Sequence, residues 1–325
     1  MPRSVQVRLV VTAAVVVCAA ITALWFNRRC VPFPMAIADR WWVTDSQKAT
    51  TDQIGVPPLV LWAWERPDDL QDVDTSRAGV AFLAGTIFIR SIAKDAGDAP
   101  DEGVVLRPRL QSLRVPERVP LMAVVRIETQ QGWSQSSYQT AQPTESADGP
   151  YTEEQRRRVV SSISRLAAFP EVQAVQIDFD AARSEQGFYQ ALLIDLRKAL
   201  PSGTPVSITA LASWCVGDPW LAKLPPGTIN EAVPMLFRMG PDGPNVASFL
   251  NGGNEFRVAA CRGSIGVSTD ESFSQEILRD GRAGNSDDLR TKRLYVFHPK
   301  TWNAETVQKT IGAVYKWHEE SSSSH

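Results

Sequence analysis

Two aspartates one residue apart lie in an apolar stretch, VQIDFDAARSE, at residues 175–185. On a β-strand successive side chains point to opposite faces, so Asp178 and Asp180 share one face and the apolar residues share the other. Burying two carboxylates side by side costs several kcal/mol unless partners or water meet them. The pattern therefore predicts a strand that ends in a polar cavity, where the pair has a functional role.

Short apolar runs alternate with helix-like stretches from residue 55 onward, which is the pattern of βα units around a parallel sheet. The predicted strands are 58–65, 79–90, 119–128, 172–180, 205–214, 231–239, 263–271 and 293–299, and the clearest helices are 151–169, 185–200 and 303–320. Eight strands with intervening helices predict an α/β fold, a (β/α)8 TIM barrel, over 55–320. An open doubly wound sheet is the alternative, which the lack of a Gly-rich phosphate loop disfavours.

The ends of the predicted strands supply the remaining candidate site residues, because barrels of this class carry their active site at the C-terminal ends of the strands. The candidate catalytic carboxylates are Glu65, Glu128, Asp178, Asp180 and Asp270, and the candidate substrate-binding residues are Arg126, Arg238, Trp64, Trp214 and His298. Carboxylates flanked by tryptophans suit a carbohydrate. One acid protonates the leaving oxygen, a second carboxylate attacks or stabilises the oxocarbenium-like centre, and flat rings stack on sugar faces.

Several of these residues also have a structural interpretation. A charge at a strand end, such as Glu65, can be a solvated ion pair. Arg126 shares a strand face with Glu128 and would keep it ionised or hold a carboxylate of a ligand. Arg238, between apolar residues of a predicted central strand, needs a buried partner. Trp62 is expected to pack against the core.

The N-terminus carries eighteen residues without a charge at 9–26, closed by Arg28 and Arg29. As a helix this run just reaches across a hydrocarbon core of roughly 27–30 Å. A cleaved signal peptide and an uncleaved signal anchor both fit. We favour the anchor, because the run is longer than a usual signal peptide core and no small-residue cleavage pattern follows it.

The sequence thus divides into a signal anchor or signal peptide (1–30), a linker (31–54), the barrel (55–320) and a disordered tail (321–325). The predicted location is a bacterial cell envelope, with the chain anchored in the inner membrane or periplasmic, or secreted if the N-terminal segment is cleaved.

Composition and cysteine usage limit the kinds of ligand and cofactor that we expect for this chain. The chain has 325 residues and a formal net charge of −2, which does not suggest a nucleic-acid-binding protein. Cys215 and Cys261 could pair in an oxidising compartment, and the sequence leaves this open. There is no CxxC pair or His/Cys cluster, so we expect no structural zinc and no cofactor. A divalent cation held by the carboxylates is a further alternative.

Five stretches, LWAWERP, VQIDFDAARSE, SITALASWC, EAVPMLFRMG and GSIGVSTDE, together resemble an uncharacterised bacterial family of unknown function that is grouped with TIM-barrel glycoside hydrolases. More distantly, IDFDA is similar to the fourth-strand motif of family-eighteen chitinases. That resemblance matches Asp178 and Asp180 to the last two aspartates of the motif and places a catalytic glutamate at residue 182. Here the residue is Ala182.

Two functions follow as hypotheses. In the first, the barrel hydrolyses an extracytoplasmic polysaccharide, with Asp178 or Asp180 as nucleophile or electrostatic stabiliser and Glu128, Glu65 or Asp270 as the acid. In the second, the same rim binds a glycan or a peptidoglycan-like ligand without cleaving it. The missing glutamate favours binding, and the retained cluster of acids favours hydrolysis.

Overall fold

The structure is a computed structural model that describes residues 54–90, 103–129, 151–218, 220–283, 287–288 and 291–322. The predicted membrane segment and the linker up to residue 53 lie outside the described residues, as does the tail beyond residue 322. Within the described ranges, no helix is both long and apolar enough for a membrane crossing.

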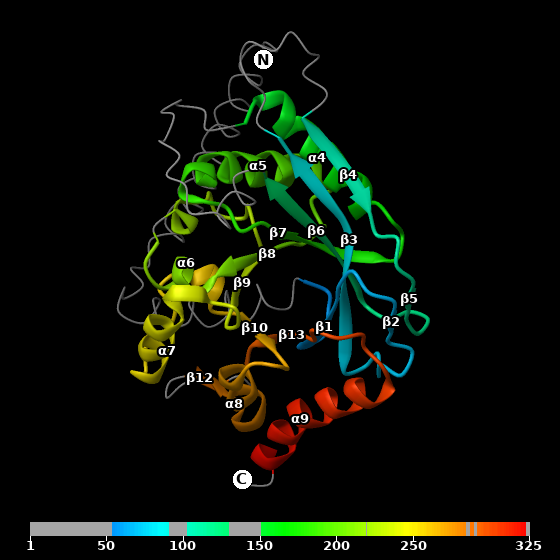
Figure 1. The fold of residues 1–325 in the computed structure, drawn as a ribbon, viewed down its shortest axis with the longest axis vertical. Helices are drawn as coiled ribbons and strands as arrows, with labels where there is room; N and C mark the ends of the chain where they lie inside the picture. The colour runs from blue at the N-terminus through cyan, green and yellow to red at the C-terminus, as the bar shows by residue number, and fades with distance from the viewer. Residues whose placement is uncertain are drawn as a thin grey trace, which may run out of the picture. The chain divides into compact units, whose positions relative to one another are not determined.

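Eight parallel strands form a closed barrel (Figure 1). In order around the barrel they are β1 (Leu59–Ala63), β3 (Ala78–Ile89), β6 (Leu121–Thr129), β7 (Val172–Asp178), β8 (Val206–Leu211), β9 (Glu231–Met235), β10 (Ser264–Ser268) and β13 (Arg293–Phe297). Each strand pairs in parallel with the next, and β13 pairs with β1, which closes the ring. The predicted (β/α)8 TIM barrel is confirmed, and the open doubly wound sheet is wrong.

Helices follow six of the eight strands. They are α4 (Glu153–Ala167), α5 (Gln186–Ala199), α6 (Ala212–Val216), α7 (Gly243–Asn251), α8 (Ser272–Asp280) and α9 (Ala304–Ser322). The helix α4 begins at a capping box, in which Thr152 and Gln155 bond each other's backbone N–H groups. The helices α4 and α5 pack side by side (Figure 1).

The first two connections are irregular. The connection from β1 to β3 holds no helix, and the described residues between β3 and β6 hold none either. Instead, β4 (Val104–Pro108) pairs antiparallel with β3, and β2 (Asp68–Asp69) pairs with β5 (Leu113–Arg114). A further two-stranded ribbon joins β11 (Arg282–Ala283) to β12 (Asp287–Asp288).

The strands alternate between two apolar layers. On β7, Val175 and Ile177 belong to the layer between the strands and the helices, whereas Ala174 packs inside the barrel. Gln176 also points inward and is fully buried, where it accepts a 2.8 Å hydrogen bond from Trp62 Nε1. The predicted alternation of β7 is therefore confirmed, with its polar face toward the barrel interior.

A buried polar chain continues across the interior. Gln176 Nε2 donates to Ser207 Oγ at 3.0 Å, and Ser207 Oγ donates to Glu231 Oε1 at 3.0 Å. Glu231 forms a 2.9 Å ion pair with Arg293, and both side chains are at most 5% exposed. Each charge thus has a bonded partner, which offsets the cost of desolvating it.

Seven of the eight predicted strands end one to four residues earlier than expected. The strand predicted at 205–214 ends at Leu211, so Trp214 lies in α6, and the strand predicted at 231–239 ends at Met235, which leaves Arg238 outside the sheet. The apolar pattern runs on because residues beyond each strand, such as Phe237, still pack onto the core. Cys215 of α6 forms a disulfide with Cys261, with the Cα atoms 5.9 Å apart.

Candidate active site

A pocket of about 270 Å³ lies at the C-terminal end of the barrel. The strands β6, β7 and β8 contribute Arg126, Asp178 and Thr209 to it, and Asp180 lines it just beyond β7. Its aromatic lining consists of Trp62, Trp64, Phe237 and Phe297. The pocket therefore combines adjacent carboxylates with flat apolar rings, of which only Trp64 was among the predicted site residues.

Asp178, the last residue of β7, is fixed from the neighbouring strand. Thr209 Oγ1 donates a 2.7 Å hydrogen bond to its Oδ1, and Arg126 Nε lies 3.9 Å from its Oδ2. Burial raises the pKa of Asp178, while the hydrogen bond from Thr209 and the charge of Arg126 act in the opposite direction and Glu128 adds to the rise. The site thus holds a carboxylate that retains its proton to higher pH than an ordinary aspartate.

Asp180 lies two residues beyond Asp178 and keeps contact with solvent at the mouth of the pocket. Desolvation by the surrounding protein, and then the negative charge of Asp178, raise the pKa of Asp180 to about 6; Arg126 opposes both. The two groups form an interacting pair in which one proton can be held near neutral pH.

Arg126 connects the acids to the aromatic wall. Its Nε lies 3.1 Å from Glu128 Oε1, and its guanidinium lies 5.9 Å from the centre of the Trp64 ring. The predicted pairing of Arg126 with Glu128 is confirmed. Because Arg126 lines the pocket and also faces Asp178, it balances negative charge on two sides.

Trp62 forms part of the pocket, although the sequence assigned it to packing. Its ring stacks on Tyr295 at 5.2 Å and is only 3% exposed. Gly266 on β10 makes room for it, since a Cβ atom there would lie 2.8 Å from Trp62 Cη2. Phe237 and Phe297 stack almost parallel at 5.5 Å beside it, and Trp64 meets the edge of Phe297 at 6.3 Å.

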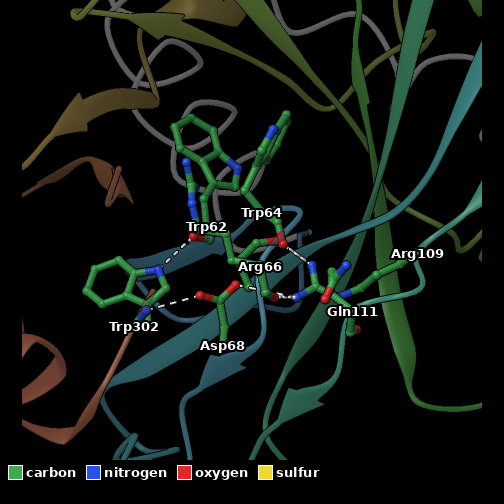
Figure 2. Close-up of polar contacts among 8 residues, drawn as sticks. Trp62, Trp64, Arg66, Asp68, Arg109, Gln111 and Trp302 are labelled. Atoms are coloured by element: carbon green, nitrogen blue, oxygen red, sulfur yellow. Dashed lines mark hydrogen bonds and ion pairs between the residues drawn. The ribbon is translucent and has the colours of Figure 1, made fainter. Parts of the chain in front are cut away.

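A buried arginine fixes the segment that carries the two tryptophans. Figure 2 shows the Arg109 guanidinium pointing into the loop after β1. Its five N–H donors meet the carbonyl oxygens of Ala63, Trp64, Arg66 and Gln111 and the carboxylate of Asp68. Arg109 and Asp68 are 8% and 2% exposed. This buried ion pair was not predicted, because Arg109 lies in a segment without a recognisable pattern.

Trp302 completes this arrangement from the other side. Its backbone N–H donates to Asp68 Oδ1 at 3.0 Å, and its indole Nε1 donates to the carbonyl oxygen of Trp62 at 2.8 Å (Figure 2). The residues following β1, β4 and β13 are thereby joined. These bonds hold the backbone of Trp62 and Trp64, and the rings of both residues line the pocket.

Five candidate residues lie outside the pocket, and one of them is Glu128, which pairs with Arg126. Glu65 is exposed and forms a 3.5 Å surface ion pair with Arg107. Asp270 accepts a hydrogen bond from Ser268 Oγ and lies 4.0 Å from the Arg238 guanidinium. His298 Nδ1 lies 2.6 Å from Thr269 Oγ1, its ring packs near Trp302, and burial lowers its pKa.

Trp214, the fifth, is only 4% exposed and meets the edge of Trp220 at 4.9 Å, so it is a core residue of α6 and not a wall of the pocket. None of the three expected cross-barrel acids lines the pocket: Glu128 faces Arg126, Glu65 faces Arg107 and Asp270 lies near Arg238.

Arg238 does line the pocket, but with a different geometry from the one predicted. It is exposed and has a φ of 51°, and among the described residues its side chain has no buried carboxylate beside it. Asp242, at the end of the short 3-10 helix Gly240–Asp242, also lines the pocket and escaped the sequence interpretation, because it follows the predicted strand by three residues.

Residue 182 does not contribute a carboxylate. The backbone N–H of Ala182 donates to Glu185 Oε2 at 2.8 Å, and Glu185 Oε1 accepts from Tyr151 at 2.9 Å. Glu185 is only 1% exposed, so it caps the turn after β7 and does not substitute for the glutamate expected at residue 182. No group of three or more His, Cys, Asp or Glu side chains among the described residues could hold a metal ion.

No family model matches the chain, and no curated protein sequence matches it. The family resemblance of the five sequence stretches therefore stays a prediction. Among solved structures, the chain is similar to a family GH18 chitinase from Chromobacterium violaceum, with 9% identity, a TM-score of 0.43, and 82% of this chain and 83% of that chain covered.

It is also similar to an endo-beta-N-acetylglucosaminidase from Cordyceps militaris, with 10% identity, a TM-score of 0.42, and 83% and 95% covered. A third match is the spore cortex-lytic enzyme SleL of Bacillus cereus, with 13% identity, a TM-score of 0.38, and 64% and 50% covered. The matched region thus spans half of the SleL chain. None of the site residues is assigned from these matches.

Proposed function

We propose that this chain is a glycoside hydrolase that acts on an extracytoplasmic polysaccharide through Asp178 and Asp180. The observation that carries the proposal is the pair itself: adjacent carboxylates at the end of β7, one with its pKa raised to about 6, in a pocket with tryptophan and phenylalanine walls. An acid with a pKa near the working pH suits proton transfer to a leaving oxygen.

The environments of the two groups suggest separate roles. Asp180 reaches solvent and would give its proton to the glycosidic oxygen as the C1–O bond breaks. Asp178, held by Thr209 and faced by Arg126, would stabilise the positive charge that develops at C1. Water then adds to C1 and returns a proton to Asp180, so the acid is restored. Trp64 supplies a ring on which a sugar can stack.

A second candidate function is glycan or peptidoglycan binding without cleavage. The observation in its favour is Ala182, because the chitinase resemblance requires a glutamate at that position and Glu185 is already bonded to Tyr151 and to the backbone. In this case the aromatic pocket binds the sugar, and the aspartate pair hydrogen-bonds its hydroxyl groups.

The proposed location is the cell envelope, with residues 9–26 as an anchor in the inner membrane. The Cys215–Cys261 disulfide supports an oxidising compartment, where such bonds form and persist. Polysaccharides of the envelope or its surroundings would then be the partners, with no role for nucleic acid.

The test is release of reducing ends from a panel of bacterial and plant polysaccharides by the full chain in detergent. We expect release by the wild type, and a loss of about 10²–10⁴-fold in Asp180→Asn, the size of a general-acid contribution. Glu65→Gln is the matched control, since it removes a carboxylate outside the pocket and should leave release unchanged. Binding of a glycan with no release by any variant would support the second candidate instead.

A further inference from the structure

Arg238 differs from the other pocket arginine in how its guanidinium is used. Arg126 bonds Glu128 and faces Asp178. Within the described part of the chain, the Arg238 guanidinium has only Asp270 Oδ2 at 4.0 Å and the ring of Phe297 at 4.9 Å. Its N–H donors therefore remain open to a ligand, because the contact with Asp270 is at the outer limit of an ion pair and is exposed to solvent.

The backbone of Arg238 is held in a strained conformation. Its φ of 51° lies in the left-handed region, which side chains other than glycine rarely adopt. Both carboxylate oxygens of Glu271 accept from its backbone N–H, at 3.0 and 3.1 Å. Strain that persists beside a pocket, with a neighbouring side chain committed to holding it, points to a functional position.

Phe297 fixes the direction of the side chain. The guanidinium lies over its ring, and the same ring lines the pocket and stacks on Phe237. A planar guanidinium placed in this way presents a fork of donors that matches a carboxylate with two parallel hydrogen bonds. Asp178 and Asp180 line the same pocket, so a carboxylate held by Arg238 and a bond cleaved by the acids could belong to one ligand.

We infer that Arg238 binds a carboxylate of the ligand, so that the pocket takes an acidic glycan, one whose sugars carry carboxylate groups. The inference deepens the proposed function and rests on it only in taking the ligand to be a glycan. Asp242 also lines the pocket and would repel such a ligand, so the carboxylate must bind at Arg238 and face away from Asp242.

The test uses end-labelled oligosaccharides of alginate, polygalacturonate, hyaluronan and xanthan, each beside its carboxyl-reduced form, in which the carboxylate has become an alcohol. Binding to the full chain is measured by fluorescence anisotropy in a detergent without a sugar headgroup. We expect at least one acidic form to bind, and its reduced form to bind about 10- to 100-fold more weakly, the size of a charge-assisted hydrogen-bond pair. Added salt should weaken the acidic binding alone.

The variant Arg238→Gly separates binding from folding. It removes the guanidinium and relieves the backbone strain, so it should lose the preference for the acidic form while its Tm stays at or above that of the wild type. Arg118→Gly is the matched control, because Arg118 has a φ of 62° and does not line the pocket. It should gain stability in the same way and bind the acidic glycan as the wild type does. Arg238→Lys, which keeps the charge but not the fork, should bind with intermediate affinity.

Several results would overturn the inference: no binding of any acidic form, equal binding of the reduced forms, or acidic binding that survives in Arg238→Gly. A lower Tm in Arg238→Gly would assign the residue to structure. Failure of the proposed function can be distinguished from failure of this inference. Cleavage of neutral glycans without binding of acidic glycans would support the hydrolase and contradict the inference. Binding of an acidic glycan that depends on Arg238, without cleavage, would support the inference and contradict the hydrolase.

Discussion

Thr209 on β8 donates a 2.7 Å hydrogen bond to Asp178 on β7, and this bond opposes the rise that burial causes in the pKa of Asp178. Replacing Thr209 by Val should therefore raise that pKa further, because a hydrogen bond to a charged group contributes about 1.5–3 kcal/mol to the ionised form. Carboxyl-carbon NMR titration checks this. Thr209→Ser keeps the hydroxyl group and should leave the titration unchanged, while an unshifted curve in Thr209→Val would contradict the assignment.

Asp180 should make stability depend on pH. Its folded pKa of about 6 lies above the ordinary value, so its favourable contribution is complete below the unfolded pKa of about 4 and is lost as pH rises through 6. Asp180→Asn should consequently be more stable than the wild type at pH 8, by about 1 kcal/mol after solvent screening at the pocket mouth.

Chemical denaturation between pH 4 and 8 measures this difference, which should vanish toward pH 4. Two stability curves that run parallel over the whole range would show that the environment of Asp180 does not favour its protonated form. Glu65→Gln provides a control in an exposed ion pair.

The sequence predicts the barrel well because alternation and strand number are properties of the chain itself. The faces of β7 follow from its pattern, and Asp178 and Asp180 lie at its carboxyl end, although the strand ends at Asp178 and not at Asp180. It predicts strand ends poorly, because Trp214 and Phe237 are buried beyond the last bonded residues of β8 and β9, and burial alone extends the apolar pattern.

Residues that reach the site through long-range contacts could not be found in this way. Thr209 looks like any strand threonine until β8 lies beside β7. Arg109 looks like a surface charge until the loop after β1 closes around it. Glu65 and Asp270 are predicted within the last residues of their strands, yet they lie beyond the ends of β1 and β10 and face other partners. The direction of a side chain beyond a strand end is set by the loop and not by the strand.

The Arg109–Asp68 pair should be a large contributor to stability. Arg109→Met leaves the Asp68 carboxylate buried without its charged partner, which costs about 3–5 kcal/mol. Arg114→Met is the matched control, since Arg114 pairs with Asp69 at 2.9 Å nearby but is 60% exposed, so its loss should cost less than about 1 kcal/mol. Urea unfolding measures both. Equal losses would show that Arg109 is no more important than a surface arginine.

The space at Gly266 should control the position of the Trp62 ring. In Gly266→Ala the new Cβ would lie 2.8 Å from Trp62 Cη2, so the indole has to move, at a cost of about 1–3 kcal/mol for overpacking. Because Trp62 Nε1 bonds Gln176 and the ring lines the pocket, the near-UV circular dichroism and ligand binding should change together. Gly312→Ala on α9 meets nothing within 4 Å and should instead stabilise the chain by about 0.5–1 kcal/mol. If Gly266→Ala left the near-UV spectrum unchanged, the contact between Gly266 and Trp62 could not be what positions the ring.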